Sequence, residues 1–299
     1  MSADTVMDPE VFLALDDLEL VGRGLAEAVL LGRHSSQRSG SGTEFHKHRS
    51  YLAGDDLRRV NWALFARHRK LFTKESRLEA RRPVHLLVDA SGSMGASNGP
   101  WTKFRYASRV AAGIAWLAEG QGDSTSLALM KKGLEGVIPS GSGQRHHAGI
   151  CATLASATPD GEGDMDRIAE EMPLFCRKPG FVILISDFFE REDELIGHLA
   201  ELKLRGHDVM ALQLLDPFEA ELPSEGDYHF IDLESGDRLR TSVEELRASH
   251  SATVTSWRAR LATRARAAGI HWISSTTAQP IIPLLREWLE NATAAGIRR

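Results

Sequence analysis

The stretch Pro83-Val-His-Leu-Leu-Val-Asp-Ala-Ser-Gly-Ser-Met-Gly95 decides the fold of this chain. Val84 to Val88 is a short β-branched and leucine-rich run, which predicts a strand buried on both faces of a sheet. Asp89, Ser91 and Ser93 follow at alternate positions, and such positions point the same way in an extended segment. One carboxylate and two hydroxyls are therefore expected at the carboxyl end of the strand, where open α/β sheets bind ligands. Oxygen donors of this kind suit a hard cation such as Mg²⁺.

Length and composition describe an ordinary globular protein. The chain has 299 residues, 42% hydrophobic and 26% charged, so it can bury a large core. Its net charge of −5 gives no general case for nucleic-acid binding. Cys151 and Cys176 form no disulfide framework or zinc pattern, which suits a reducing compartment. No apolar run approaches the roughly 20 residues that span a bilayer, and the start lacks the pattern of an export signal, so we expect a soluble cytoplasmic protein without a membrane segment.

The pattern along the chain predicts one main domain with an accessory segment. Residues 9–32 are periodic like an amphipathic helix with Asp8 as its N-cap. Residues 33–82 are basic with interleaved aromatics, and we interpret them as short strands and turns. We expect residues 1–82, the helix and this β-rich segment, to pack on a main domain at 83–299. In the main domain, alternating strands and helices predict an α/β fold with a mostly parallel sheet covered on both faces. The predicted strands are 84–88, 124–131, 134–138, 181–185, 209–214, 229–231, 239–240 and 270–273, and the helices are 103–118, 148–157, 166–175, 195–204, 243–268 and 281–289.

The Asp89-Ala-Ser91-Gly-Ser93 motif resembles the metal-ion-dependent adhesion site of von Willebrand factor A-type domains. The segment ahead of it sharpens the resemblance, because its motifs are similar to those of the bacterial family called domain of unknown function 58. The match covers most of residues 33–95. The residues that carry it are Glu44-Phe45, Tyr51, Gly54, Asp55, Asp56, Arg58, Trp62 and Ala66-Arg67. The sequence departs from the family at Asn61, where an aspartate usually precedes the tryptophan.

The resemblance implies a von Willebrand factor A-like, Rossmann-like fold and a set of metal ligands. Asp89, Ser91 and Ser93 would hold the metal, and the later aspartate of such sites maps onto Asp187, which follows the buried run 181–185. The usual threonine is missing, because Gly163 stands in its place within the loop 158–164. Glu162, Asp164 or water would then complete the coordination. The resemblance also implies a partner, since the family is usually encoded beside MoxR-type AAA+ ATPases and is thought to assist protein assembly or maturation.

These expectations lead to a functional hypothesis with three alternatives. We expect a non-enzymatic adaptor in which a partially coordinated Mg²⁺ binds an acidic side chain of a partner protein, together with a MoxR-type ATPase and its client. In a purely structural alternative, Ser91, Ser93 and Asp187 satisfy loop donors and cap the next helix. In another, the chain is a metal-free scaffold that binds through residues 33–82. A serine hydrolase using Ser93 is less favoured, because the nucleophile elbow lacks its first glycine and His271 begins the last strand.

Three other features have simple interpretations. Asp55 or Asp56 with Arg58 is expected to form a structural ion pair that pins the basic segment. The adjacent His146 and His147 are expected in a loop as a solvent-exposed pair, and His46 with His48 on a basic surface. A basic stretch with aromatics could bind single-stranded nucleic acid, but the net charge makes this a minority interpretation. The acidic stretch 160–194 could attract residues 33–82, although a solvated face is the default.

Overall fold

The computed structural model describes residues 16–34, 48–51, 62–74, 82–189, 191–231 and 238–294. The chain forms two compact units, one made of Met1–Gly32 with Arg82–Arg299 and the other of Arg33–Arg81. The N-terminal helix thus groups with the main unit, whereas the sequence-based division placed it with the basic segment, ahead of residue 83. Across the described residues, no helix combines the length and the apolar character needed to cross a membrane.

The larger unit is built on a six-stranded sheet in the order β10-β7-β6-β3-β4-β5. All neighbouring strands are parallel except β5, which runs antiparallel to β4 at one edge. The decisive stretch thus provides a central strand, and the predicted α/β class with a mostly parallel sheet is confirmed. The strands are β3 (Val84–Asp89), β4 (Thr125–Lys131), β5 (Gly133–Gly141), β6 (Phe181–Ser186), β7 (Asp208–Leu215) and β10 (His271–Thr276).

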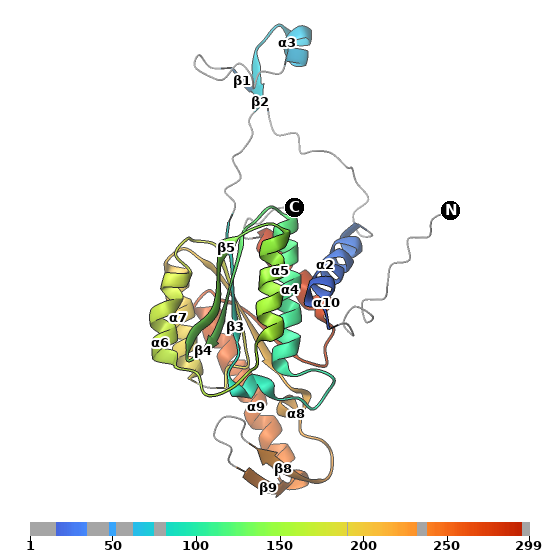
Figure 1. Cartoon of the computed structure of the whole chain (residues 1–299), viewed down its shortest axis with the longest axis vertical. Coiled ribbons are helices and arrows are strands. Elements are labelled where there is room, and N and C mark those ends of the chain that lie inside the picture. The colour runs from blue at the N-terminus through green and yellow to red at the C-terminus, as the bar shows by residue number, and fades with distance from the viewer. Residues whose placement is uncertain are drawn as a thin grey trace, which may run out of the picture. The chain divides into compact units, whose positions relative to one another are not determined.

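Helices cover both faces of this sheet, as the buried runs predict. Alternate residues of β3 enter two separate cores, with Leu86 and Val88 in one and Leu87 in the other. The first core contains side chains of α2, α4, α5 and α10, and the second those of α6, α7 and α9 (Figure 1). These helices are α2 (Leu18–His34), α4 (Lys103–Gly120), α5 (Gln144–Ser156), α6 (Met165–Phe175), α7 (Glu192–Leu204), α9 (Val243–Ala267) and α10 (Ile281–Ala294).

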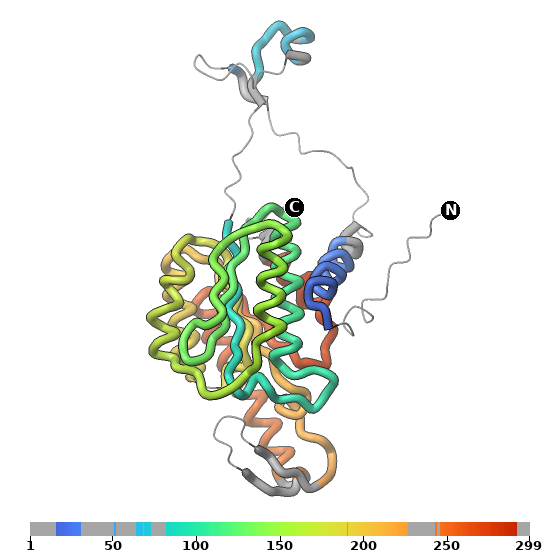
Figure 2. Tube along the Cα trace, in the orientation of Figure 1, coloured from blue at the N-terminus to red at the C-terminus, as the bar shows by residue number. Residues whose placement is uncertain are grey.

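Helix α2 runs alongside α4 and α10 (Figure 2). A Cβ atom at Gly22 would lie 3.0 Å from backbone atoms of Ala112, so the two helices approach closely at this glycine. The described helix begins at Leu18, because the Asp17 carboxylate accepts hydrogen bonds from the amides of Glu19 and Leu20. The earlier start expected at Asp8 lies outside the described residues.

Smaller elements complete both units. The hairpin β8 (Asp227–Ile231) and β9 (Arg238–Ser242) precedes α9, as predicted, and the short helix α8 (Pro217–Ala220) follows β7. In the second unit, β1 (His48–Ser50) pairs antiparallel with β2 (Phe72–Lys74). The helix α3 (Trp62–His68), by contrast, was expected as strands and turns. Alanine, leucine and arginine are good helix formers and the stretch has no glycine or proline, which explains the helix.

Candidate functional site

Two acidic residues lie at the carboxyl edge of the sheet. Asp89 is the last residue of β3 and Asp187 directly follows β6, and these strands are parallel neighbours with Val88 opposite Ile185. Both side chains are buried, with exposed fractions of 7% for Asp89 and 2% for Asp187. The two predicted acids therefore lie at the same edge of the sheet, and both are buried there.

Serine residues donate hydrogen bonds to both oxygens of the Asp89 carboxylate. Its Oδ1 accepts a hydrogen bond from the Ser91 amide at 2.9 Å, and its Oδ2 accepts one from the Ser186 hydroxyl at 2.6 Å. The Ser91 and Ser93 hydroxyl oxygens are 3.1 Å apart. The strand does not continue through these serines as expected, since a 3-10 turn begins at Gly92 and itself brings the two hydroxyls together.

The electrostatics of Asp89 favour a nearby cation. Burial raises the pKa of Asp89, and the negative charge of Asp187 raises it further, to about 6. A positive charge bound at Asp89 would relieve this repulsion. Among the residues that the structure describes, no three His, Cys, Asp or Glu side chains group as metal ligands. A cation at Asp89 would therefore depend on the serine hydroxyls and on water, which Mg²⁺ tolerates.

Asp187 is already paired with a protein cation. The Lys103 ammonium, fully buried at the start of α4, lies 2.7 Å from Asp187 Oδ2 and 2.6 Å from Glu219 Oε1. Burial disfavours the ammonium, but the two carboxylates outweigh it and raise the pKa of Lys103. The Phe189 amide donates a hydrogen bond to the other oxygen, Asp187 Oδ1. Lys103 thus joins α4 to the loop after β6, through Asp187, and to α8 after β7, through Glu219. For Asp187 this pairing comes in addition to the metal role that the resemblance implies.

Sequence reasoning missed Lys103 and Glu219. One signal was available, because a lysine in the first turn of a helix opposes the helix dipole and needs a compensating acid. Glu219 gave no comparable signal. It belongs to a capping box with Asp216, whose carboxylate also accepts hydrogen bonds from the backbone and side chain of Asn98. Polar contacts thereby connect the segments that follow β3, β6 and β7.

The loop expected to replace the missing threonine contacts the site through its backbone. The Asp160 amide donates to the Ala90 carbonyl, and the Gly161 carbonyl accepts from the Gly92 amide. The Asp164 side chain caps α6 by accepting a hydrogen bond from the Arg167 amide. Glu162 and Gly163 belong to the same loop, and Glu162 is exposed.

An unusual backbone conformation follows Asp187. Phe188 has a φ of 61°, in the left-handed region that bulky side chains rarely adopt, while its ring is buried against Trp272. Phe189 is partly exposed, stacks on Trp257 and lies with its ring 4.8 Å from the Lys103 ammonium. Strain of this kind is maintained only where surrounding contacts require it.

The accessory residues belong to the smaller unit. Tyr51 donates its backbone amide to the Leu71 carbonyl beside the β1–β2 pair, and Trp62 and Arg67 lie in α3. Gly54, Asp55, Asp56 and Arg58 lie outside the described residues, as do His46 and Asn61, so the expected Asp–Arg pair stays a prediction.

Most acids of the stretch 160–194 are paired within the larger unit itself. Basic partners of this unit bind these acids in several ion pairs, so mutual attraction is not needed to explain the charge of the stretch. The pairs are Lys131–Asp160, Arg191–Asp166, Arg167–Glu171, Arg260–Glu192, Arg264–Asp193 and Arg191–Glu194.

The interpretation of His146 and His147 as an exposed loop pair is wrong. Both lie in the first turn of α5, and His147 is buried edge-on against Trp116 with its Nε2 3.4 Å from Cys151 Sγ. His146 Nε2 contacts the Thr125 carbonyl. His147 lies on the buried face of the amphipathic helix α5, and its ring can pack there because a neutral imidazole carries no charge to desolvate.

We expect His147 to make stability depend on pH. Burial, and then the charge of His146, lower its pKa to about 4, against roughly 6.5 in an unfolded chain. The neutral His147 therefore contributes roughly 3 kcal/mol to the free energy of unfolding above about pH 6.5, and this contribution is lost as the pH falls through about 4. Urea unfolding of the wild type and His147→Phe at both ends of this window measures it. The same pH dependence in both proteins would contradict the expectation.

Comparisons with known proteins identify a family. Residues 47–260 match the family described as "Protein of unknown function DUF58". Uncharacterized proteins of Mycobacterium bovis and Mycobacterium tuberculosis are each 29% identical over 286 residues, which cover 94% of this chain and 87% of each relative.

Solved structures to which the chain is similar include the conserved hypothetical protein BatB from Bacteroides thetaiotaomicron. It is 14% identical with a TM-score of 0.48, covering 71% of this chain and 99% of that protein. The SpRpn10 VWA domain is 11% identical with a TM-score of 0.42, covering 73% of this chain and 97% of that domain. Because the family match extends from the accessory unit into α9, the chain belongs to the DUF58 family.

Proposed function

We propose that this protein is a non-enzymatic adaptor that binds a partner protein at the carboxyl edge of its sheet, with Mg²⁺ held at Asp89. The observation that carries the proposal is the pair of buried acids, Asp89 and Asp187, beside the two serine hydroxyls. Asp89, Ser91 and Ser93 would hold the ion. With few protein ligands, such an ion keeps coordination positions that an acidic side chain of the partner can fill.

The position of His271 argues against the hydrolase alternative. His271 begins β10, whereas Ser93 follows the end of β3, and the strands run parallel through this part of the sheet. The two residues therefore lie at opposite edges. His271 instead contacts the side chain of Asn291 in α10.

Calorimetric titration with Mg²⁺ tests the ion site. We expect one ion per chain in the wild type, and binding at least about tenfold weaker in Asp89→Asn, because a ligating carboxylate is lost. Asp166→Asn is a matched control, since Asp166 is an exposed acid paired with Arg191. Equal Mg²⁺ binding by the wild type and Asp89→Asn would remove the ion from the proposal.

A pull-down tests the partner. The family resemblance favours a MoxR-type AAA+ ATPase, with a client protein whose assembly or maturation it assists. We expect retention of that ATPase to fall with EDTA and with Asp89→Asn, and to persist with Asp166→Asn. If retention of the ATPase is unchanged by EDTA and by Asp89→Asn but is lost when residues 33–82 are removed, the result would support the metal-free scaffold instead.

A further inference from the structure

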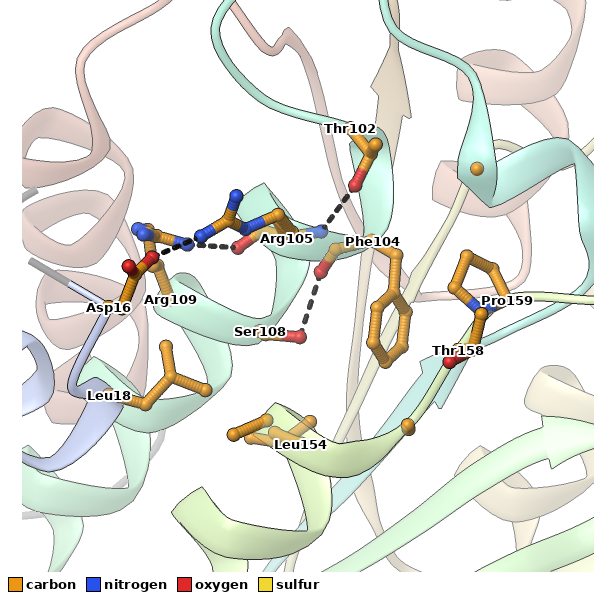
Figure 3. A pocket seen from close by; sticks show the side chains of 13 residues that line it. Asp16, Leu18, Thr102, Phe104, Arg105, Ser108, Arg109, Leu154, Thr158 and Pro159 are labelled. Carbon is orange, nitrogen blue, oxygen red and sulfur yellow. Dashed lines mark hydrogen bonds and ion pairs between the residues drawn. The ribbon is translucent and has the colours of Figure 1, made fainter. Parts of the chain in front are cut away.

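A cavity of about 580 Å³ opens beside the carboxyl edge (Figure 3). Its walls come from the start of α2, the first turns of α4, the end of α5 and the loop at 157–159. Gly95, just after Ser93, and Pro159, just before the loop residue bonded to Ala90, also line it. The loops that surround Asp89 therefore also form one wall of this cavity.

The walls divide into an apolar part and a cationic part. Leu18, Phe104, Leu154 and Ala155 contribute carbon surface. The volume is ample for a leucine or phenylalanine side chain and the backbone on either side of it. An apolar group entering this space would leave water, which favours binding by roughly 25 cal/mol per Å² of apolar surface buried.

Two guanidinium groups supply the cationic part. Arg105 and Arg109 lie one turn apart on α4 and both face the ring of Trp101, at 5.6 and 4.0 Å from its centroid. Like charges at this spacing repel. Burial and the charge of Arg105 lower the pKa of Arg109 to about 10.

Asp16 is the acid among the residues that line the cavity. It pairs with Arg105 at 2.5 Å, and its side chain is 91% exposed. Exposed ion pairs of this kind contribute little to stability. A carboxylate that binds both arginines would compete well with it, since charge-assisted bidentate contacts are the stronger kind.

We propose that this cavity binds a segment of the partner protein in which an apolar side chain lies next to a carboxylate. The apolar side chain occupies the space between Phe104 and Leu154, and the carboxylate pairs with Arg105 and Arg109. The inference rests on the proposed function, because the same segment would continue past Gly95 to the acid-binding edge. It specifies the chemistry of that partner beyond a single acidic residue.

The test measures binding of the peptide Gly-Ser-Leu-Asp-Gly-Ser, with both of its ends blocked, to the whole chain in the presence of EDTA. Binding is monitored by NMR titration. Two matched peptides replace the leucine by serine or the aspartate by asparagine. We expect each matched peptide to bind at least about tenfold more weakly, because each loses one of the two contacts. Arg105→Gln and Ala155→Trp should each lower the affinity for the parent peptide by at least about tenfold. The first variant loses a positive charge, and the second fills the cavity with an indole ring.

Matched controls are available on α5. Arg145→Gln removes an exposed positive charge outside the cavity, and Ala152→Trp adds an indole at an exposed position that does not line it. Both should bind the parent peptide like the wild type. Equal binding of all three peptides, no binding at all, or cavity variants that bind like the controls would each overturn the inference.

A separate Mg²⁺ titration distinguishes this inference from the proposed function. Arg105→Gln and Ala155→Trp should bind Mg²⁺ like the wild type. If the protein binds Mg²⁺ normally but does not bind the peptide, the cavity inference is wrong and the proposed ion site is unaffected. Selective peptide binding without any Mg²⁺ binding would support the cavity and count against the ion.

Discussion

Replacing Lys103 by methionine should lower the free energy of unfolding by about 3–5 kcal/mol, the usual cost of removing one partner from a buried ionic group. The change leaves the buried Asp187 and the partly buried Glu219, whose side chain is 24% exposed, without their shared cation. Methionine keeps the length and most of the volume of the side chain, so packing loss is small. Urea unfolding near neutral pH measures the effect.

The pH dependence of the variant provides an independent signature. Burial raises the pKa of Glu219 and the charge of Lys103 opposes this, so loss of the ammonium should raise the pKa of Glu219 further. The stability deficit should therefore shrink as pH falls towards the range where Glu219 is protonated. The triple variant Lys103→Met, Asp187→Asn, Glu219→Gln should recover most of the loss, because no unpaired charge stays buried.

A surface ion pair provides the comparison. Lys131 pairs with Asp160, whose side chain is 73% exposed. Lys131→Met should cost less than about 1 kcal/mol, as solvent-screened pairs do. If Lys103→Met cost no more than Lys131→Met, the Lys103 cluster would have no special structural role.

Replacing Gly180 by alanine should also be strongly destabilising, by about 3 kcal/mol or more. A Cβ atom there would lie 2.1 Å from the carbonyl oxygen of Pro83, a backbone atom that no rotamer change can move. The same carbonyl accepts a hydrogen bond from the Phe181 amide, and the Gly180 carbonyl accepts one from Asp208. Relief of the clash would disturb the amino-terminal ends of β3, β6 and β7 together.

Gly197 is the matched control for this substitution. It lies at an exposed position of α7, and a Cβ atom there would meet nothing within 4 Å. Gly197→Ala should raise stability by about 0.5–1 kcal/mol, because alanine restricts the unfolded chain and favours the helix. Thermal unfolding of both variants checks the pair. A Gly180→Ala protein as stable as the wild type would contradict the close approach.

The sheet and most helices were predictable because their signals are local and periodic. The apolar runs at 84–88 and 181–185 are β3 and β6, each one residue longer in the structure. The hydrophobic period of 103–118 likewise gives α4. The start of α2 was less predictable, because Asp8-Pro9 carries the local N-cap signal whereas Asp17 caps the described helix, and because the burial of α2 beside Ala112 depends on tertiary packing.

Errors arose where a residue's role depends on a distant part of the chain. His147 is polar by composition, but Trp116 and Cys151 make its environment apolar. The shared direction of Ser91 and Ser93 was attributed to an extended strand, whereas a 3-10 turn produces it. In both cases the local pattern lacks the neighbour that decides the geometry.

The sequence by itself determined the α/β class, most strands and helices of the larger unit and the arrival of Asp89 and Asp187 at one sheet edge. Parallel strands must end at the same edge, so their last residues are predictable once the strands are known. Only the tertiary structure decided which charges meet there. Lys103, Asp187 and Glu219 are far apart in the chain, and the packing of α4 against the loops after β6 and β7 makes them one buried cluster.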